Sequence, residues 1–356
     1  MKSLFIGSSE SRSGKSALCV GLGSILKDKG LNVGYMKPVG SLARTVNKTT
    51  YEDDAFKTRE ALGLSESPDK ICPVLISEEL VDAKLKGVKK YHKNKIIKTF
   101  QDLSAGKDVM ILEGMGDIGG GSMFDLSDPE VAALLDAKII LTAKYDSDYV
   151  LDRVISDVKL IGDPKQLVGV IFTDVSPANA RRIKRTVTPF LRKKKIKVLG
   201  YIPKDTLLKS ASVADIAEEL GGRIICCEEY KNELVKSFII GAMSPEHALK
   251  YFRRSTDKAV ITGGDRADIV LAALETQTKC VVLTGNLRPS AQVLAAAEDA
   301  KTPLIVVPHD TVTAVTLVED LIDKITAWEG AKLARMKQFM RNHIDLKAIY
   351  RELSVK

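Results

Sequence analysis

A lysine and a hydroxyl beside a glycine, in the run Gly14-Lys15-Ser16, are the first residues whose types and spacing could do chemistry. Glycine lets the backbone approach a phosphate, lysine reaches the β- and γ-phosphate oxygens, and a serine hydroxyl can bind Mg²⁺. Six residues separate Gly7 from Gly14, whereas the strict pattern has four. The run still predicts a phosphate-binding loop, whose candidate nucleotide contacts are Ser9, Glu10, Ser11, Arg12, Ser13, Gly14, Lys15, Ser16 and Ala17.

Acidic residues at two other places could hold a metal ion. Asp54 closes the run Glu52-Asp53-Asp54 at the start of a helix-forming stretch, and Glu113 ends an apolar run. A carboxylate at the end of a buried strand is the pattern by which nucleotide-binding proteins place an acid beside Mg²⁺. Carboxylates at a helix start can equally complement the helix dipole. The residues alone therefore leave the acids of this run, Asp54 included, open between metal binding and complementing the helix dipole.

The elements that position these groups follow from the apolar pattern. Helix-length segments separate apolar runs that are typical of buried strands, at 4–6, 32–36, 108–112, 137–141, 167–172 and 197–202. Such alternation indicates an α/β fold with right-handed crossovers and a mostly parallel sheet. Lys37 would then lie at a strand tip on the side where the loop opens. Thr173 and Asp174 would end the fifth strand, where such folds often recognise a base.

Five motifs together resemble those of the dethiobiotin synthetase-like P-loop family: Gly14-Lys15-Ser16, Lys37-Pro38-Val39, Asp54-Ala55, Glu113-Gly114-Met115-Gly116 and Gly200-Tyr201-Ile202-Pro203. The resemblance covers about the first 205 residues and implies a three-layer P-loop NTPase domain that binds ATP and Mg²⁺. Ser8 and Arg12 stand where the family usually has a glycine and an acid.

The same resemblance implies roles for individual residues. Lys15 and Lys37 would be the catalytic residues, acting on the phosphates and the substrate. Asp54 and Glu113 would bind Mg²⁺, and Ser16 would be its hydroxyl ligand.

From about residue 206 a second set of apolar runs predicts another, smaller α/β domain, with strands at 223–226, 237–240, 259–262, 280–284 and 304–307. Two of these strands end in a Thr-Gly turn, on the edge of the sheet that usually binds ligands. Gly263, Gly264, Asp265 and Arg266 therefore form a second candidate site, for an anionic metabolite or nucleotide. Backbone N–H groups and the planar Arg266 cation would bind the anion, and Asp265 would orient Arg266 or bind a ribose hydroxyl. Alternatively, the glycines serve only a tight turn.

The stretch from Thr262 to Ile269 resembles the motif of the DRTGG domain, an α/β module. A dethiobiotin synthetase-like domain followed by a DRTGG domain resembles the N-terminal, non-catalytic part of long phosphate acetyltransferases. The expected domains are therefore 1–205, 206–325, and a C-terminal helix at 326–356 with Trp328 in its packing stripe. The resemblance implies a nucleotide- or metabolite-responsive regulatory protein without acetyltransferase activity. The alternative is an enzyme, either a slow ATPase or an ATP-dependent ligase acting on a small carboxylate or amine.

The composition of the chain limits which classes of partner we expect. The net charge of +8 is densest between Arg181 and Lys197, a stretch with Phe190 as its one aromatic residue, so bases have no stacking platform there. We interpret it as a solvated helix face and expect no nucleic-acid partner. No apolar run reaches the roughly 20 residues that a membrane helix needs, so we expect no membrane partner. Five cysteines favour a reduced cytoplasmic protein, and we also expect a homo-oligomer.

Overall fold

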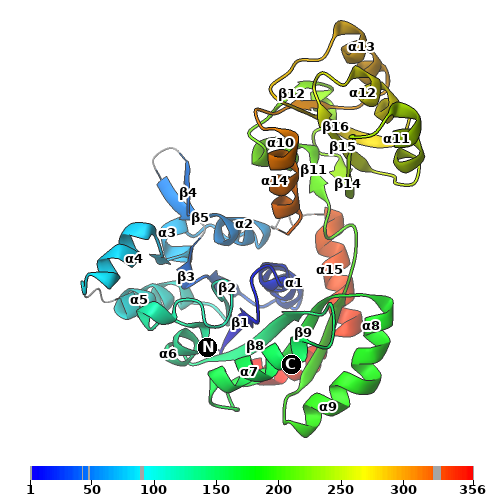
Figure 1. Ribbon diagram of the computed structural model, residues 1–356. Helices are drawn as coiled ribbons and strands as arrows, with labels where there is room; N and C mark the ends of the chain where they lie inside the picture. Colours follow the sequence, from blue (N-terminus) through cyan, green and yellow to red (C-terminus); the bar gives the residue numbers. More distant parts are fainter. Residues whose placement is uncertain (1, 42, 47–48, 89–91, 324–329, 356) are drawn as a thin grey trace. The chain divides into compact units, whose positions relative to one another are not determined.

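The structure, a computed structural model, describes residues 2–41, 43–46, 49–88, 92–323 and 330–355. These residues form two compact units (Figure 1). The first unit contains the chain up to Lys204 and the C-terminal residues from 330 onward, and the second contains residues 205–323. The expected boundary between 325 and 326, and Trp328, lie outside the described residues.

A parallel sheet organises the first unit. Within the described residues it has six strands in the order β10-β9-β8-β1-β7-β2, and every neighbouring pair is parallel. The strands are β1 (Lys2–Ser8), β2 (Val33–Met36), β7 (Val109–Glu113), β8 (Ala137–Lys144), β9 (Leu167–Val175) and β10 (Val198–Pro203). Because all of them run the same way, their carboxyl ends lie along one edge. The strands expected from the apolar runs are all present.

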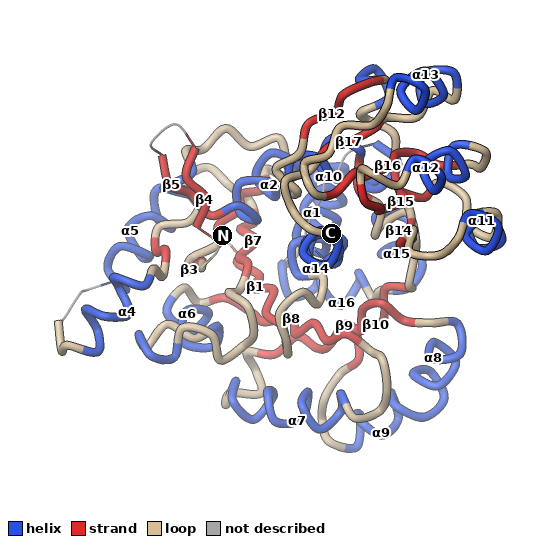
Figure 2. The backbone as a smooth tube through the Cα atoms, turned by 45° about the horizontal axis from the view of Figure 1, so that its top comes forward, coloured by secondary structure: helices blue, strands red, loops and turns tan. Residues whose placement is uncertain are grey.

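Helices cover both faces of this sheet, as Figure 2 shows. On one face lie α1 (Lys15–Asp28), α15 (Gly330–His343) and α16 (Leu346–Leu353). On the other lie α5 (His92–Ser104), α6 (Asp128–Leu134), α7 (Val150–Ile161) and α9 (Thr188–Lys193), which share a buried core with Phe5, Leu112 and Leu141. The expected three-layer α/β architecture is therefore confirmed.

The C-terminal segment differs from expectation, because two helices replace the single one. Ile344 forms a bridge with Gly200 of β10, and the Asp345 N–H donates to the Leu199 carbonyl at 2.7 Å. The Asp345 carboxylate then caps α16 by accepting from the Ala348 N–H at 3.0 Å. These contacts end one helix and begin the next.

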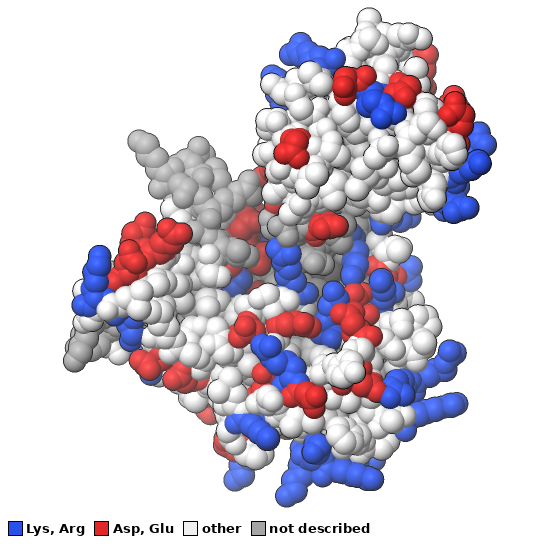
Figure 3. Space-filling view, in the orientation of Figure 1, with Lys and Arg blue, Asp and Glu red and all other residues white. Residues whose placement is uncertain are grey.

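The basic stretch forms α8 (Pro177–Arg182), a π-helical turn (Ile183–Val187) and α9. Ile183, Val187 and Leu191 are buried. The Lys and Arg side chains between Arg181 and Lys197 are exposed, and Figure 3 shows basic side chains gathered over α8 and α9. This distribution fits a solvated helix face.

Smaller elements complete the first unit, on the side of the sheet where β2 lies. They are β3 (Val39–Gly40), the hairpin β4 (Ala43–Val46) and β5 (Thr49–Glu52), α2 (Asp53–Ala61), α3 (Pro68–Ile71), β6 (Val74–Leu75) and α4 (Glu78–Leu85). A short 3-10 turn, η1 (Ser122–Phe124), precedes α6. The hairpin brings the chain back from β3 to the start of α2.

The second unit has its own sheet, with five strands among the described residues in the order β12-β17-β16-β15-β14. The strands are β12 (Arg223–Cys226), β14 (Ser237–Ile240), β15 (Lys258–Gly263), β16 (Thr278–Thr284) and β17 (Leu304–Val306), and β12 alone of these is antiparallel to its neighbour. One face packs on α10 (Val213–Glu219) and α14 (Thr311–Asp323), and the other on α11 (Pro245–Phe252), α12 (Ala267–Leu274) and α13 (Ala291–Asp299). A two-stranded ribbon, β11 (Ala211–Ser212) with β13 (Leu234–Val235), and the turn η3 (Glu228–Tyr230) complete it.

Two findings bear on compartment and membrane. All five cysteines lie among the described residues and are free. In the part of the chain that the structure describes, no helix combines the length and apolar character needed to cross a bilayer.

Candidate nucleotide site

The amino-terminal end of α1 lies at the carboxyl edge of the main sheet, directly after β1 and its loop. Gly14, with φ at 83°, is the N-cap residue and provides no side-chain cap, and the first turn has no acidic residue. Other helices of the chain are capped, for example α2 by Glu52 and α10 by Ser212. An α-helix leaves its first N–H groups without intrahelical partners, and its dipole attracts negative charge. The start of α1 is therefore suited to an anion such as phosphate.

Neighbouring strands hold the loop between β1 and α1 in place. The Ser13 and Thr142 hydroxyls are hydrogen-bonded at 2.8 Å, and the Thr173 hydroxyl donates to the Ser13 carbonyl at 2.8 Å. Glu10 accepts from the Lys144 N–H at 3.2 Å. Thr173 thus supports the loop backbone, while its neighbour Asp174 adopts a φ of 57° at the end of β9. That the pair recognises a base stays a prediction.

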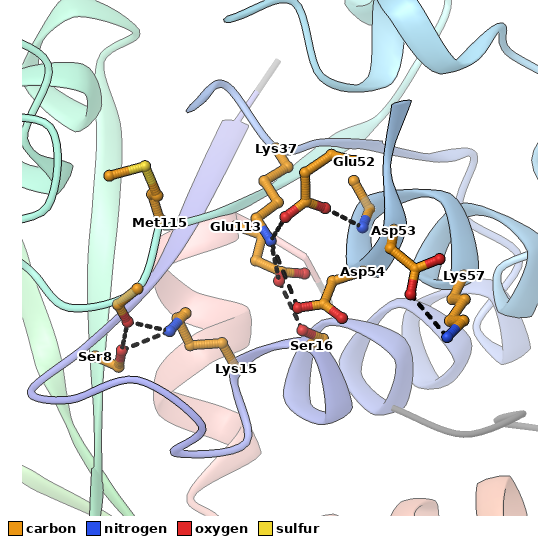
Figure 4. A network of polar contacts seen from close by, with 12 residues as sticks. Ser8, Lys15, Ser16, Lys37, Glu52, Asp53, Asp54, Lys57, Glu113 and Met115 are labelled. Atoms are coloured by element: carbon orange, nitrogen blue, oxygen red, sulfur yellow. Dashed lines mark hydrogen bonds and ion pairs between the residues drawn. The ribbon is translucent and has the colours of Figure 1, made fainter. Parts of the chain in front are cut away.

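Lys15 reaches back across the loop. Its ammonium donates to the Ser8 hydroxyl at 2.7 Å and to the Gly116 carbonyl (Figure 4). Burial lowers the pKa of Lys15, while the Asp128 and Glu113 carboxyls oppose that shift. Polar groups of the protein thus hold the lysine where phosphate oxygens could replace them.

Ser16 and Glu113 are in direct contact. The Ser16 hydroxyl donates to Glu113 Oε1 at 2.6 Å, and the Tyr35 hydroxyl donates to Glu113 Oε2 at 2.8 Å. Glu113 is 1% exposed at the end of β7. Two hydroxyls therefore fix this carboxylate beside the first turn of α1.

Lys37 lies among three carboxylates (Figure 4). Its Nζ atom is 2.5 Å from Glu52 Oε1, 3.6 Å from Glu113 Oε1 and 3.9 Å from Asp54 Oδ2. Although burial lowers the pKa of Lys37, the Glu113, Glu52 and Asp54 carboxylates raise it above its ordinary value. Burial also raises the pKa of Glu52 and of Asp54, outweighing the opposite effect of Lys37. Burial thus disfavours the charged forms of Glu52 and Asp54, while the Lys37 ammonium favours them.

The three acids at the start of α2 lie in two environments. Glu52 and Asp54 face Lys37, whereas Asp53 pairs with Lys57 at 2.9 Å along the helix. Glu52 also accepts from the Ala55 N–H at 2.6 Å, so it is the residue that caps the helix. The capping role that the sequence left open for Asp54 therefore belongs to Glu52.

Ser16, Asp54 and Glu113 fit the donor set of a magnesium ion. All three offer hard oxygen atoms, and protein-bound Mg²⁺ commonly takes one or two carboxylates together with substrate phosphates and waters. Among the described residues no group of three or more His, Cys, Asp or Glu side chains is arranged for a metal. The predicted site has two carboxylates and a hydroxyl, so phosphate oxygens would have to complete it.

Two residues of this edge, Tyr35 and Asp128, were not expected from the sequence, and Glu52 was expected only as a member of the acidic run. Asp128 is 2% exposed, and its Oδ1 accepts from the Met115 N–H at 3.2 Å. Its Oδ2 has no hydrogen-bond partner within the described residues, and burial raises the pKa of this carboxyl well above its ordinary value. The capping motif around it, from Ser127 to Glu130, indicates the start of α6 and gives no sign of what Asp128 faces.

The second candidate site lies at the carboxyl edge of the smaller sheet. The Gly264 N–H donates to the Thr284 carbonyl at 3.1 Å, so the two Thr-Gly turns meet there. The backbone N–H groups of Gly264, Arg266 and Gly285 all donate hydrogen bonds to carbonyls of the second unit. Asp268, rather than Asp265, orients Arg266, accepting from its Nε and NH2 at 2.9 Å each. Asp268 lies in the first turn of α12 and presents both carboxylate oxygens to the guanidinium group of Arg266, a geometry that the sequence spacing did not reveal.

Comparison with known proteins now identifies the domains. A family model described as an AAA domain (AAA_26) matches residues 2–212, which is more than half of the chain. The chain belongs to this P-loop family. A second model, described as a DRTGG domain, matches residues 215–321. The resemblance expected for both parts of the sequence is confirmed.

Individual relatives match over different lengths. A phosphate acetyltransferase of Pseudomonas putida is 25% identical over 97% of this chain and 51% of its own length. An ATP-dependent dethiobiotin synthetase of Methanococcus vannielii is 30% identical over 49% of this chain and 81% of its own length. One matching solved structure contains the CBS and DRTGG domains of a Clostridium perfringens pyrophosphatase, complexed with its activator diadenosine tetraphosphate. It is 21% identical in sequence, covers 43% of this chain and 74% of the pyrophosphatase chain, and has a TM-score of 0.30. The chain spans about half the length of the phosphate acetyltransferases that it matches.

Proposed function

We propose that this chain binds ATP with Mg²⁺ at the loop from Gly7 to Ser16. The observation that carries the proposal is the uncapped start of α1, with Lys15 and Ser16 in its first turn and Glu113 bonded to Ser16. The first N–H groups of α1 would hold phosphate oxygens, and Lys15 would exchange Ser8 and Gly116 for the β- and γ-phosphates. Mg²⁺ on Ser16, Asp54 and Glu113 would neutralise charge on the same phosphates.

The proposal includes a regulatory role, in which nucleotide or metabolite binding is the signal. Supporting it, the similarity to phosphate acetyltransferases runs through both units and not the P-loop part alone. We further propose that the chain works in the cytoplasm as a homo-oligomer, and that these 356 residues do not transfer acetyl groups. The edge around Arg266 would take an anionic metabolite or nucleotide.

A second candidate function is an ATP-dependent ligase or slow ATPase. It is favoured by Lys37, which lies at the same edge as Lys15, and by the dethiobiotin synthetase relative. In a ligase, the Lys37 ammonium would stabilise negative charge that develops on a transferred phosphoryl group or an attacking carboxylate.

Calorimetric titration of ATP in the presence of Mg²⁺ tests the binding site. Lys15→Ala should lose a charge-assisted contact of about 1.5–3 kcal/mol, or roughly ten-fold or more in affinity. Lys27→Ala is the matched control, because Lys27 lies in the same helix but donates to the Leu62 carbonyl. Equal ATP affinity in the wild type and Lys15→Ala would refute the assignment.

Two further measurements separate the regulatory role from the ligase. Thermal shift with nucleotides, acyl phosphates and CoA compounds, with and without Mg²⁺, identifies what stabilises the protein. ATP turnover that rises with a carboxylate or amine among the candidates would favour the ligase, whereas binding without coupled turnover favours regulation. Conversion of acetyl phosphate and CoA by homogeneous protein would contradict the proposal that the chain lacks acetyltransferase activity.

A further inference from the structure

Glu52 contacts Lys37 more closely than the other two carboxylates do. The Lys37 Nζ atom lies 2.5 Å from Glu52, against 3.6 Å from Glu113 and 3.9 Å from Asp54. The second oxygen of Glu52 is held by the Ala55 N–H at 2.6 Å, at the cap of α2. Both oxygens of Glu52 are therefore engaged, one by the lysine and one by the helix.

Asp54 and Glu113 differ from Glu52, because they are the two acids of the proposed Mg²⁺ site. A lysine ammonium and a divalent cation would compete for these carboxylates. Since Lys37 is 4% exposed, its ammonium cannot turn to bulk water if it loses its partners. A buried ammonium must stay paired, because an unpaired buried charge is very costly.

We propose that Glu52 is a positioning residue, which holds the Lys37 ammonium so that Asp54 and Glu113 can bind Mg²⁺ when ATP enters. This inference rests on the proposed function and assigns Glu52 a part in it. Without the Glu52 charge, Lys37 would pair fully with Asp54 and Glu113 and would oppose the metal.

The charges of the cluster agree with this role. With all three carboxyls ionised, three carboxylates and one ammonium leave two negative charges, which favour a divalent cation. Removing the charge of Glu52 would leave the ammonium and the metal to share the two carboxylates of Asp54 and Glu113. It also follows that Lys37, held by Glu52, does not replace Mg²⁺ as the cation that screens the phosphates, so ATP should bind poorly without the metal.

The test is calorimetric titration of ATP at increasing Mg²⁺ concentration, which gives the concentration needed for half of the full affinity. In Glu52→Gln that concentration should rise about ten-fold or more, because Lys37 loses its charge-assisted partner. The Gln side chain keeps an oxygen for the Ala55 N–H, so the helix cap survives. Glu130→Gln is the matched control, since Glu130 belongs to the capping box of α6 and does not contact Lys37.

A double variant distinguishes positioning from a merely structural role. Adding Lys37→Met to Glu52→Gln removes the competing ammonium and should return the Mg²⁺ requirement to within about three-fold of the wild type, as expected for residues that act through each other. An unchanged requirement in Glu52→Gln, or a raised one that Lys37→Met does not restore, would overturn the inference while ATP binding by the wild type stands. A wild type that binds no ATP at any Mg²⁺ concentration would overturn the proposed function as well. Thermal unfolding of each variant shows that it is folded.

Discussion

Replacing Lys37 by Met should destabilise the first unit, because the change leaves buried carboxylates without their ammonium. Glu52 and Glu113 are each 1% exposed, and water cannot take the place of the lysine. Breaking a buried ion pair by removing one partner costs about 3–5 kcal/mol. Met fills nearly the same volume, so the loss reports on charge and not on a cavity. Calorimetric unfolding measures it, with hydrogen exchange of peptides from each unit to assign the transitions.

The loss should grow with pH. Burial raises the pKa of Glu52 from 4.5 to about 7, with Lys37 opposing the shift. A carboxyl whose folded-state pKa is raised contributes stability that is present below its unfolded value and is lost as pH rises through the folded value. The wild type therefore loses this contribution between about pH 4.5 and 7. Without Lys37 the folded pKa of Glu52 rises further, so the deficit of Lys37→Met should be small in acid and largest above neutral pH.

Lys258→Met in the second unit is the matched control. Lys258 is also completely buried, but its Nζ atom donates to the carbonyls of Ser255 and Gln277, at 3.2 and 3.1 Å. Burial lowers the pKa of Lys258 to about 8, so its charge is costly where it lies. Exchange for an apolar side chain should change stability by no more than about 1 kcal/mol near neutral pH. The reasoning fails if Lys37→Met is as stable as the wild type above neutral pH, or if its deficit is larger in acid.

Three further predictions follow from single contacts. Asp54→Asn and Glu113→Gln should each weaken the Mg²⁺ dependence of ATP binding, because hard cations prefer carboxylate oxygens. Titration of ATP at varied Mg²⁺ concentration measures this dependence. An Asp54→Asn variant that behaves as the wild type would exclude Asp54 from the metal site. Gly200→Ala should cost about 1–3 kcal/mol through overpacking, since a Cβ there would overlap the His343 carbonyl oxygen. Hydrogen exchange of residues 330–353 should rise as a result. Arg266→Ala should lower the affinity for whichever metabolite the thermal-shift screen identifies for the second unit. Because coupling is reciprocal, it should also change the effect of that metabolite on ATP affinity. Unchanged affinities for ATP and for the metabolite would mean that the glycines serve only a tight turn.

The framework of both units was predictable because it depends on local patterns. Buried parallel strands are short apolar runs, and helix-length segments between them leave few alternatives to a parallel sheet. The hairpin of β4 and β5 escaped prediction because its residues show no apolar alternation. The break between α15 and α16 also escaped, since it depends on Gly200 and Leu199, which are far away in the sequence.

The candidate site also contains residues that local sequence patterns predict and residues that they do not. Lys15, Ser16 and Glu113 follow from a strand, a loop and a helix that are consecutive or end at one edge, and the structure brings them together. Tyr35 and Glu52 carry no such signal, because an apolar strand and a helix cap explain their residue types equally well. Which carboxylate faces Lys37 depends on how α2 lies against the sheet edge, and residue types alone do not determine that.

The return of the chain to its first unit gives the P-loop helix a support that no local pattern indicates. After the second unit the chain continues into α15, which packs on α1, and Met336 and Met340 are buried there. At Gly21 of α1 any Cβ would lie 2.6 Å from the Met340 sulfur, so a larger residue would push the helices apart. The helix that begins with Lys15 is thus held in place by residues that follow the DRTGG domain in the chain. A ligand that changes how residues 330–343 are held would act on α1 through the contacts at Gly21 and Asp28. Coupling between such sites is typically about 1–3 kcal/mol, enough for an ATP affinity that responds to a second ligand.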